Sequence, residues 1–251
     1  MASSLKLLAW DTQFFGFRVA AYHAAQHYAD ELQKQLQAAR DAGIVLFTYF
    51  APAGTQITPS IKHSLVDTRH IYMHDLNGDV LDGLRDPPDT IEVYHSKTTT
   101  PELEALGVLS GTHSRFFYDP IFPDKAAEAM YISWTRQCCA NQSEFLILIA
   151  KDESGEIAGW LATRDKRDLG VFQPMLMAVN PSIRGQGIAT GFFTYAMNWG
   201  QEKGFKMGRV NTQGRNKVAC RIYERLGWTL ESRKDVFHIW LADPTEKVEY
   251  A

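Results

Sequence analysis

A short turn in the second half of the chain carries the residues best suited to hold an anionic ligand. Arg184, Gly185 and Gly187 follow an apolar run of strand length, Pro174–Val179, and a helix pattern begins at Gln186. The first N–H groups of a helix have no partner within the helix, and the helix dipole adds positive potential there. Glycine lacks a Cβ, so a phosphate can approach the backbone, and arginine donates well to phosphate oxygens. The turn therefore predicts a site for a phosphorylated ligand.

Two common phosphate-binding motifs do not fit this turn. A dinucleotide fingerprint needs a third glycine where the sequence has Thr190, and a P-loop needs a Gly-Lys-Ser/Thr ending that the turn lacks. The remaining alternative is a structural turn that binds nothing. The next segments argue against it, because a strand pattern at Phe205–Thr212 is followed by Asn216, a good N-cap for a helix at Lys217–Leu226.

These segments resemble the two motifs of the GNAT superfamily of N-acetyltransferases. In the coenzyme A loop, written Q/R-x-x-G-x-G/A, the fixed places are filled by Arg184, Gly187 and Ala189. The second motif, N-x-x-A-x-x-x-Y-x-x-x-G-F, is matched in register by Asn216, Ala219, Tyr223 and Gly227. Trp228 replaces the usual Phe. The resemblance implies an α/β fold, with a mixed, mostly antiparallel sheet flanked by helices.

The same resemblance implies where acetyl-CoA lies. Its pantetheine arm pairs with the strand before the turn, which splays from the next strand. A backbone N–H near Met177 or Ala178 then faces the oxyanion that develops during acetyl transfer. The residues implied to bind acetyl-CoA are Met177, Ala178, Val179, Arg184, Gly185, Gln186, Gly187, Ile188, Ala189, Thr190, Asn211, Asn216 and Tyr223. We expect no metal, because no Cys/His cluster has zinc spacing.

Tyr223 is the implied catalytic residue. In many GNAT enzymes the tyrosine at this place protonates the leaving thiolate, and a phenol with a reference pKa of about 10 is protonated at neutral pH. The alternative is a core aromatic residue at helical spacing, and Asn216 is in the same way open to a purely structural capping role. The general base is not identified: a positioned water, Asp119, His113 and His238 are the alternatives.

Segments outside this core resemble the TDP-fucosamine acetyltransferase group, which acetylates the 4-amino group of a nucleotide-linked amino sugar. The matching segments are Trp10–Phe17, Leu65–Leu76, His113–Phe122 and Phe237–Leu241. The implied substrate-binding residues are Arg115, Phe116 and Asp119. Arg115 suits a pyrophosphate or carboxylate, and Phe116 offers a face to a base or sugar.

This second resemblance implies direct acetyl transfer to a sugar of the TDP-4-amino-4,6-dideoxyhexose type, for cell-surface polysaccharide synthesis. Two alternatives stay open. One is a GNAT enzyme acting on a peptide or another small amine, and the other is a non-catalytic module that binds acyl-CoA.

Composition sets limits on location and partners. The 251 residues include no apolar run long enough to span a membrane, and the start lacks the pattern of a signal peptide. A net charge of −3 argues against general nucleic-acid binding. Three cysteines, two of them adjacent, fit reduced thiols in a cytoplasmic protein. The oligomeric state stays open, with a homodimer as one alternative.

The order of predicted elements divides the chain at residue 112. Residues 1–112 form an N-terminal α/β domain, with a helix over Tyr22–Gly43 and strands at Ile44–Phe50 and Leu65–Leu76. Residues 113–251 form the GNAT domain. At its end we expect two strands, Trp228–Arg233 and Val236–Leu241, joined by a tight turn at Lys234-Asp235.

Overall fold

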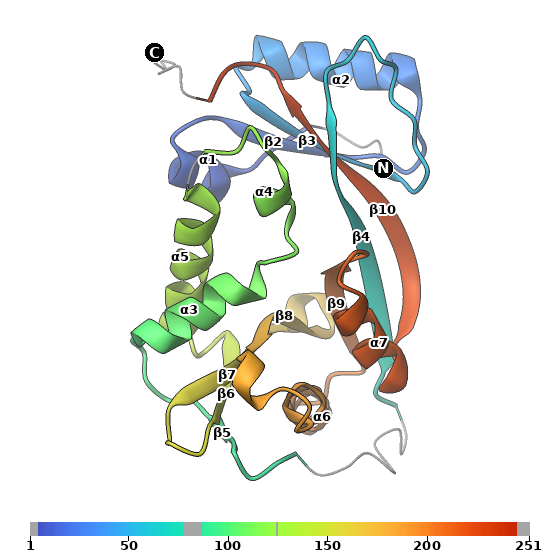
Figure 1. The fold of residues 1–251 in the computed structure, drawn as a ribbon. Helices are drawn as coiled ribbons and strands as arrows, with labels where there is room; N and C mark the ends of the chain where they lie inside the picture. The colour runs from blue at the N-terminus through green and yellow to red at the C-terminus, as the bar shows by residue number, and fades with distance from the viewer. Residues whose placement is uncertain (1–4, 78–86, 124, 245–251) are drawn as a thin grey trace.

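The structure, a computed structural model, describes residues 5–77, 87–123 and 125–244. Within these ranges ten strands form one sheet in the order β1-β2-β3-β10-β4-β9-β8-β7-β6-β5 (Figure 1). The strands are β1 (Lys6–Leu7), β2 (Val19–His23), β3 (Leu46–Pro52), β4 (Ser64–Asp75), β5 (Ile91–Val93), β6 (Phe145–Lys151), β7 (Ile157–Lys166), β8 (Val171–Val179), β9 (Met207–Gln213) and β10 (Thr229–Trp240). Only β2 with β3 and β8 with β9 are parallel neighbours among them.

Helices flank this sheet. They are α1 (Ala9–Phe15), α2 (Ala29–Asp41), α3 (Pro101–Ser110), α4 (Arg115–Tyr118), α5 (Ala126–Ala140), α6 (Ile188–Glu202) and α7 (Lys217–Arg225). The predicted mixed, mostly antiparallel sheet with flanking helices is therefore confirmed. No helix in the described ranges combines the length and apolarity that crossing a bilayer requires.

Strand β4 belongs to the first half of the chain but lies between two strands of the second half. Its Tyr72 is in register with Val210 of β9 on one side and Leu230 of β10 on the other. In Figure 1, β4 and β10 run side by side and connect the end of the molecule that carries α2 to the end that carries α6 and α7. The division at residue 112 stays a prediction, but one sheet runs through both parts.

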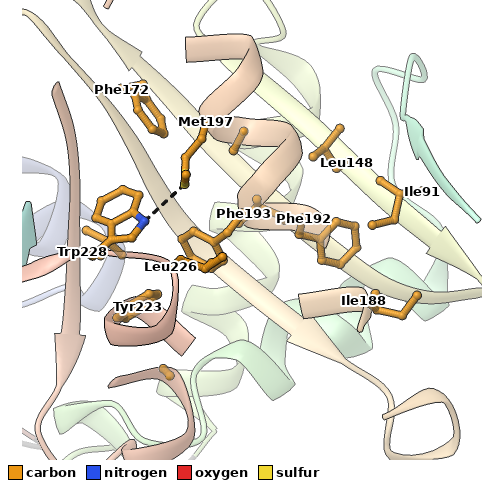
Figure 2. Close-up of a cluster of buried hydrophobic side chains, with 14 of the residues drawn as sticks. Ile91, Leu148, Phe172, Ile188, Phe192, Phe193, Met197, Tyr223, Leu226 and Trp228 are labelled. Carbon is orange, nitrogen blue, oxygen red and sulfur yellow. Dashed lines mark hydrogen bonds between the residues drawn. The ribbon is translucent and has the colours of Figure 1, made fainter. Parts of the chain in front are cut away.

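Two apolar clusters cover opposite faces of the sheet. Leu148 of β6 joins the cluster under α6 and α7, whereas its neighbour Ile149 joins the cluster under α3 and α5. Successive side chains of a strand point to opposite faces, so this alternation is expected for a strand covered on both sides. Figure 2 shows the first cluster, where the Trp228 indole donates to the Met197 sulfur at 3.4 Å and Phe193 lies beside both.

The predicted helix over Tyr22–Gly43 is wrong at its start. Tyr22 lies in β2, and α2 begins only at Ala29. The reason is tertiary pairing: Ala20 and Tyr22 are buried and lie in parallel register with Phe47 and Tyr49 of β3, which outweighs the helix propensity of the alanines.

The expected turn at Lys234-Asp235 is also wrong, because β10 continues through it as one strand. Both residues are paired with β3 and β4 at once. Their polar groups are bonded across the sheet: the Lys234 ammonium donates to the Ala24 carbonyl at 2.8 Å, and the Asp235 carboxylate accepts from the Gly54 N–H at 2.7 Å. A charged pair inside a strand therefore does not mark a turn here.

Candidate active site

The turn after β8 has the geometry that its glycines predict. Gly185 and Gly187 have φ of 81° and 82°, a left-handed conformation that favours glycine. No atom lies within 4 Å of the place where a Cβ would stand on either residue. Gly187 is the N-cap of α6 and supplies no side-chain acceptor, so no cap group occupies the first N–H groups of this helix. The result is an open cradle with backbone donors at a helix N-terminus.

Strands β8 and β9 diverge beside this cradle. They pair in parallel only at Val171 with Met207 and at Phe172 with Gly208, and beyond these residues no pairing joins them. Gly208 is needed at the last pair, because a Cβ there would lie 2.6 Å from the Trp228 ring and 2.7 Å from the Phe172 ring. The two strands therefore open toward their carboxyl ends, which leaves backbone groups of β8 free for an extended ligand.

A bulge distorts β8 at the edge of this opening. Ala162 of β7 pairs with Leu176 and Thr163 pairs with Pro174, so Met175 is the extra residue. Met175 is 43% exposed although its strand neighbours are buried. Bulges change the direction of backbone groups locally and are frequent next to active sites. The expected strand starts at Pro174, whereas β8 begins at Val171, so the proline lies inside the strand, where bulges commonly accommodate it.

A cavity of about 550 Å³ begins where β8 and β9 separate. Its walls are formed by residues 173–176 of β8 and 211–213 of β9, with further residues from β3, β4, α4 and α5. The size is within the usual range for small-molecule sites, roughly 300–1,000 Å³. Aromatic side chains line part of it: Trp10, Phe50, Phe116, Tyr131, Trp134 and Phe145.

Five charged residues of the described ranges line this cavity, and two of them, Arg164 and Glu144, form an ion pair at 2.9 Å. The other three dominate its chemistry. Asp67 and Arg69 come from β4, and Arg115 is the first residue of α4. Asp67 is only 6% exposed, and its Oδ1 has no hydrogen-bond partner. Burial raises the pKa of Asp67 to about 6, although Arg215 and Arg115 act in the opposite direction. A carboxylate whose pKa lies this close to neutrality is suited to accept a proton.

Tyr223 of α7 does not line the cavity and belongs to the apolar cluster under α6 and α7. It is 5% exposed, and its ring packs against Phe193 and Trp228 (Figure 2) and against Tyr72. Burial raises the pKa of Tyr223, with a hydrogen bond to Thr212 acting in the opposite direction. Thr212 itself lines the cavity. The phenol is therefore held protonated beside Thr212, a residue of the cavity wall.

A comparison with protein families identifies the domain that carries the turn after β8 and most of the cavity lining. Residues 112–228 match the model described as the acetyltransferase (GNAT) family. The chain contains a GNAT acetyltransferase domain. The predicted resemblance to this superfamily is confirmed for this domain.

Two curated relatives match this GNAT protein over about half of its length. The spore coat polysaccharide biosynthesis protein SpsD of Bacillus subtilis is 32% identical over 131 residues, which cover 52% of this chain and 44% of the relative. The dTDP-fucosamine acetyltransferase of Escherichia coli O6:H1 is 26% identical over 144 residues, covering 57% and 61%. The matched region thus spans less than two thirds of either relative.

Solved structures share the fold at low identity. A GCN5-related N-acetyltransferase from Sphaerobacter thermophilus superposes with a TM-score of 0.56 and 13% identity, over 98% of this chain and 78% of that one. The likeness includes the N-terminal part of the chain, which the family model does not cover.

The predicted acetyl-CoA residues lie on four segments: the end of β8, the turn with the start of α6, β9, and α7 with its N-cap. Met177, Ala178 and Val179 end β8, and the residues from 184 to 190 form the cradle and the first turn of α6. Asn211 lies apart from them, on β9 in the cavity wall. Asn216 caps α7 by accepting from the Ala219 N–H at 3.1 Å. The Arg184 Nε donates a hydrogen bond to the Val179 carbonyl at 3.0 Å, and this bond connects the turn to the end of β8.

The predicted substrate residues separate. Arg115 and Phe116 line the cavity, with the Arg115 Cζ 4.2 Å from the centre of the Phe116 ring. Asp119 does not line it: its buried carboxylate is bonded to His238 Nδ1 at 2.6 Å and accepts from the Trp240 indole at 2.8 Å. Two of the proposed bases, Asp119 and His238, are thus bonded to each other behind the site.

Sequence reasoning missed the residues that β4 contributes. Asp67 and Arg69 lie in the matched segment Leu65–Leu76, but they were not singled out. Alternation along the strand was the available signal, since Asp67, Arg69 and Ile71 share one face, and two charges on one face of a central strand require an explanation.

Proposed function

We propose that this GNAT protein transfers an acetyl group from acetyl-CoA to the amine of a nucleotide-linked amino sugar, as a step in cell-surface polysaccharide synthesis. The observation that carries the proposal is the cavity at the opening of β8 and β9, where the Asp67 Oδ1 has no hydrogen-bond partner and aromatic and basic side chains surround it. The names of the two curated relatives, which refer to polysaccharide biosynthesis and to dTDP-fucosamine, support it.

The residues around the turn suit acetyl-CoA. The cradle at Gly185 and Gly187 has space for a phosphate and backbone donors at the start of α6. The unpaired end of β8, Met177–Val179, offers peptide groups to an extended pantetheine arm. When bound, acetyl-CoA supplies an activated acetyl group as a thioester. A backbone N–H of β8 near the bulge at Met175 or at Met177 would stabilise the developing oxyanion, which is typically worth roughly 3–4 kcal/mol.

The remaining steps concern protons on this chain. Asp67 accepts a proton from the substrate ammonium, so the amine becomes nucleophilic in the cavity. Tyr223 holds a proton at its hydroxyl beside Thr212 and donates it to the departing sulfur. As the new C–N bond forms and the C–S bond breaks, the nitrogen loses a second proton, which would restore the hydroxyl of Tyr223. After one turnover only Asp67 carries an extra proton, and it releases this proton to solvent. Asp67 thereby takes the role of base that the sequence left open.

The two parts of the chain then have different roles. Residues 113–251 form the GNAT domain and bind acetyl-CoA, while residues 1–112 contribute β4 and with it Asp67 and Arg69. All three cysteines, Cys138, Cys139 and Cys220, are buried free thiols. We therefore place the reaction in the reducing cytoplasm.

The test is a thiol-release assay with acetyl-CoA and a panel of amines. The panel contains TDP-4-amino-4,6-dideoxyhexoses, UDP-amino sugars, a free amino sugar and a peptide with a free N-terminus. We expect turnover with a nucleotide-linked amino sugar and much slower turnover with the free sugar. Efficient turnover of the peptide alone would refute the sugar proposal, and binding of acetyl-CoA without turnover of any amine would refute catalysis.

A further inference from the structure

The cavity contains an excess of positive charge that the acetyl transfer itself does not explain. Arg69 and Arg115 both lie near Phe50, with their Cζ atoms 5.5 Å and 5.9 Å from its ring centre. No ion pair joins either guanidinium to a carboxylate within the described residues. The Arg115 Nε is buried and has no hydrogen-bond partner. A buried donor without a hydrogen-bond partner requires an explanation, and a polar ligand in the cavity would supply one.

Placing these guanidinium groups together is costly. Burial, together with the nearby charges of Arg115 and Arg209, lowers the pKa of Arg69 to about 10. Burial also lowers the pKa of Arg115. Asp11 and Asp67 act on Arg115 in the opposite direction, but of these two only Asp67 acts on Arg69. A ligand with at least two negative charges would relieve the repulsion and complete the hydrogen bonds.

We propose that Arg69 and Arg115 form the subsite for the diphosphate of the nucleotide sugar, separate from the phosphate cradle for coenzyme A on the α6 side. This inference rests on the proposed function and specifies which part of the substrate the N-terminal half recognises. Arginine matches phosphate oxygens through paired donors, and a diphosphate can engage two guanidinium groups at once. A carboxylate would need only one of them.

The spacing along β4 agrees with a 4-amino sugar. Asp67 and Arg69 are two residues apart in a regular stretch of strand, so their side chains share a face and are separated by about 7 Å at the backbone. A hexose ring carries its 4-amine and its 1-diphosphate on opposite sides of the ring. One sugar can therefore present its amine to Asp67 while its diphosphate reaches Arg69 and Arg115.

The experiment is calorimetric titration of the full chain in saturating coenzyme A, so that the cradle at α6 is already occupied. The probes are TDP, inorganic pyrophosphate and thymidine. We compare wild type with Arg69→Gln and Arg115→Gln, and with Arg40→Gln, which alters an exposed arginine at the end of α2. Loss of one charge-assisted hydrogen-bonding group should weaken TDP and pyrophosphate about 10- to 100-fold. Thymidine affinity and the Arg40→Gln control should not change.

Two further readouts separate binding from folding. Removing one of several like charges should leave the melting temperature of Arg69→Gln equal to or above that of wild type. Arg69→Lys, which keeps the charge but loses the paired donors, should show an intermediate loss of TDP affinity. TDP affinity that is unchanged in both glutamine variants would overturn the subsite.

The outcomes also distinguish this subsite from the proposed function. Acetylation of a nucleotide sugar with a KM that does not respond to Arg69→Gln would overturn the subsite and leave acetyl transfer intact. TDP binding that requires Arg69, in a protein that acetylates only peptides, would overturn the proposed function and leave the subsite intact.

Discussion

Replacing Asp67 with asparagine separates catalysis from stability in this protein. Asn keeps the size of the side chain and an acceptor for the Thr68 backbone N–H, but it cannot take a proton from the amine. A general base typically contributes 10²- to 10⁴-fold to the rate. We therefore expect kcat/KM of Asp67→Asn to fall by about two to four orders of magnitude at pH 7, while the affinity for acetyl-CoA stays unchanged.

The pH profile provides the more specific assay. The base must be ionised to act, so wild-type kcat/KM should rise with pH, reach half of its plateau at about pH 6, the pKa of Asp67, and stay level above it. Asp67→Asn should lose this rise. The control is Glu153→Gln, which removes an exposed carboxylate in the turn between β6 and β7. An unchanged rise in Asp67→Asn would assign the proton transfer to another group.

The same substitution should stabilise the fold. The pKa of Asp67 rises from 3.8 to about 6 on folding, so the folded state favours the protonated carboxyl. The stability that the protonated carboxyl contributes is fully present below pH 3.8 and is lost as pH rises through 6. The difference between the two pKa values corresponds to about 3 kcal/mol in the free energy of unfolding. Asparagine is neutral at every pH and avoids the loss. Urea unfolding at pH 7 should therefore show Asp67→Asn more stable by up to about 3 kcal/mol, and a lower midpoint than wild type would contradict this reasoning.

Three further substitutions test the rest of the site. Tyr223→Phe keeps the ring in its aromatic cluster, so it should lower kcat about 10²- to 10⁴-fold with the melting temperature little changed, and an unchanged kcat would exclude proton donation by Tyr223. Gly187→Ala should raise KM for acetyl-CoA at least about tenfold, and its left-handed backbone should also destabilise the fold by roughly 1–2 kcal/mol. Gly155→Ala, at φ 85° in the turn between β6 and β7, should lose stability by a similar amount without a change in KM. Equal KM values for the two variants would count against the cradle. Gly208→Ala forces a Cβ into two aromatic rings and should lower the free energy of unfolding by about 1–3 kcal/mol in urea titrations, and no shift of the midpoint would mean that the rings relax freely.

The fold of the second half could be predicted because its signals are local. Asn216 predicts the start of helix α7, and in the structure its side chain accepts a hydrogen bond from the Ala219 N–H. The turn at Gly185 and Gly187 is likewise specified by the glycines themselves, whose positive φ other residues adopt only with strain. Such features depend on neighbours a few residues away, so the sequence alone contains them.

The errors occur where distant partners decide the structure. Tyr22 reads as helical beside its alanines, but it is held in β2 by pairing with β3. Lys234 and Asp235 read as a turn, but they lie in a strand because β3 and β4 pair with them on both sides. In each case the competing contacts come from residues more than twenty positions away, which local propensity does not include.

The candidate site shows the same division at the level of chemistry. The acetyl-CoA cradle is one continuous segment, and its residues carry a readable motif. The cavity is assembled from β4, α4, β8 and β9, and its charges meet only because β4 is inserted between β9 and β10. Asp67 has an ordinary sequence context, and its raised pKa arises from burial in this assembled cavity. Within this protein, the proposed site for the co-substrate can therefore be recognised from the sequence, while the proposed site for the amine depends on tertiary placement. The same insertion explains why an N-terminal half outside the matched family region is needed: without β4 the cavity has neither the proposed base nor Arg69.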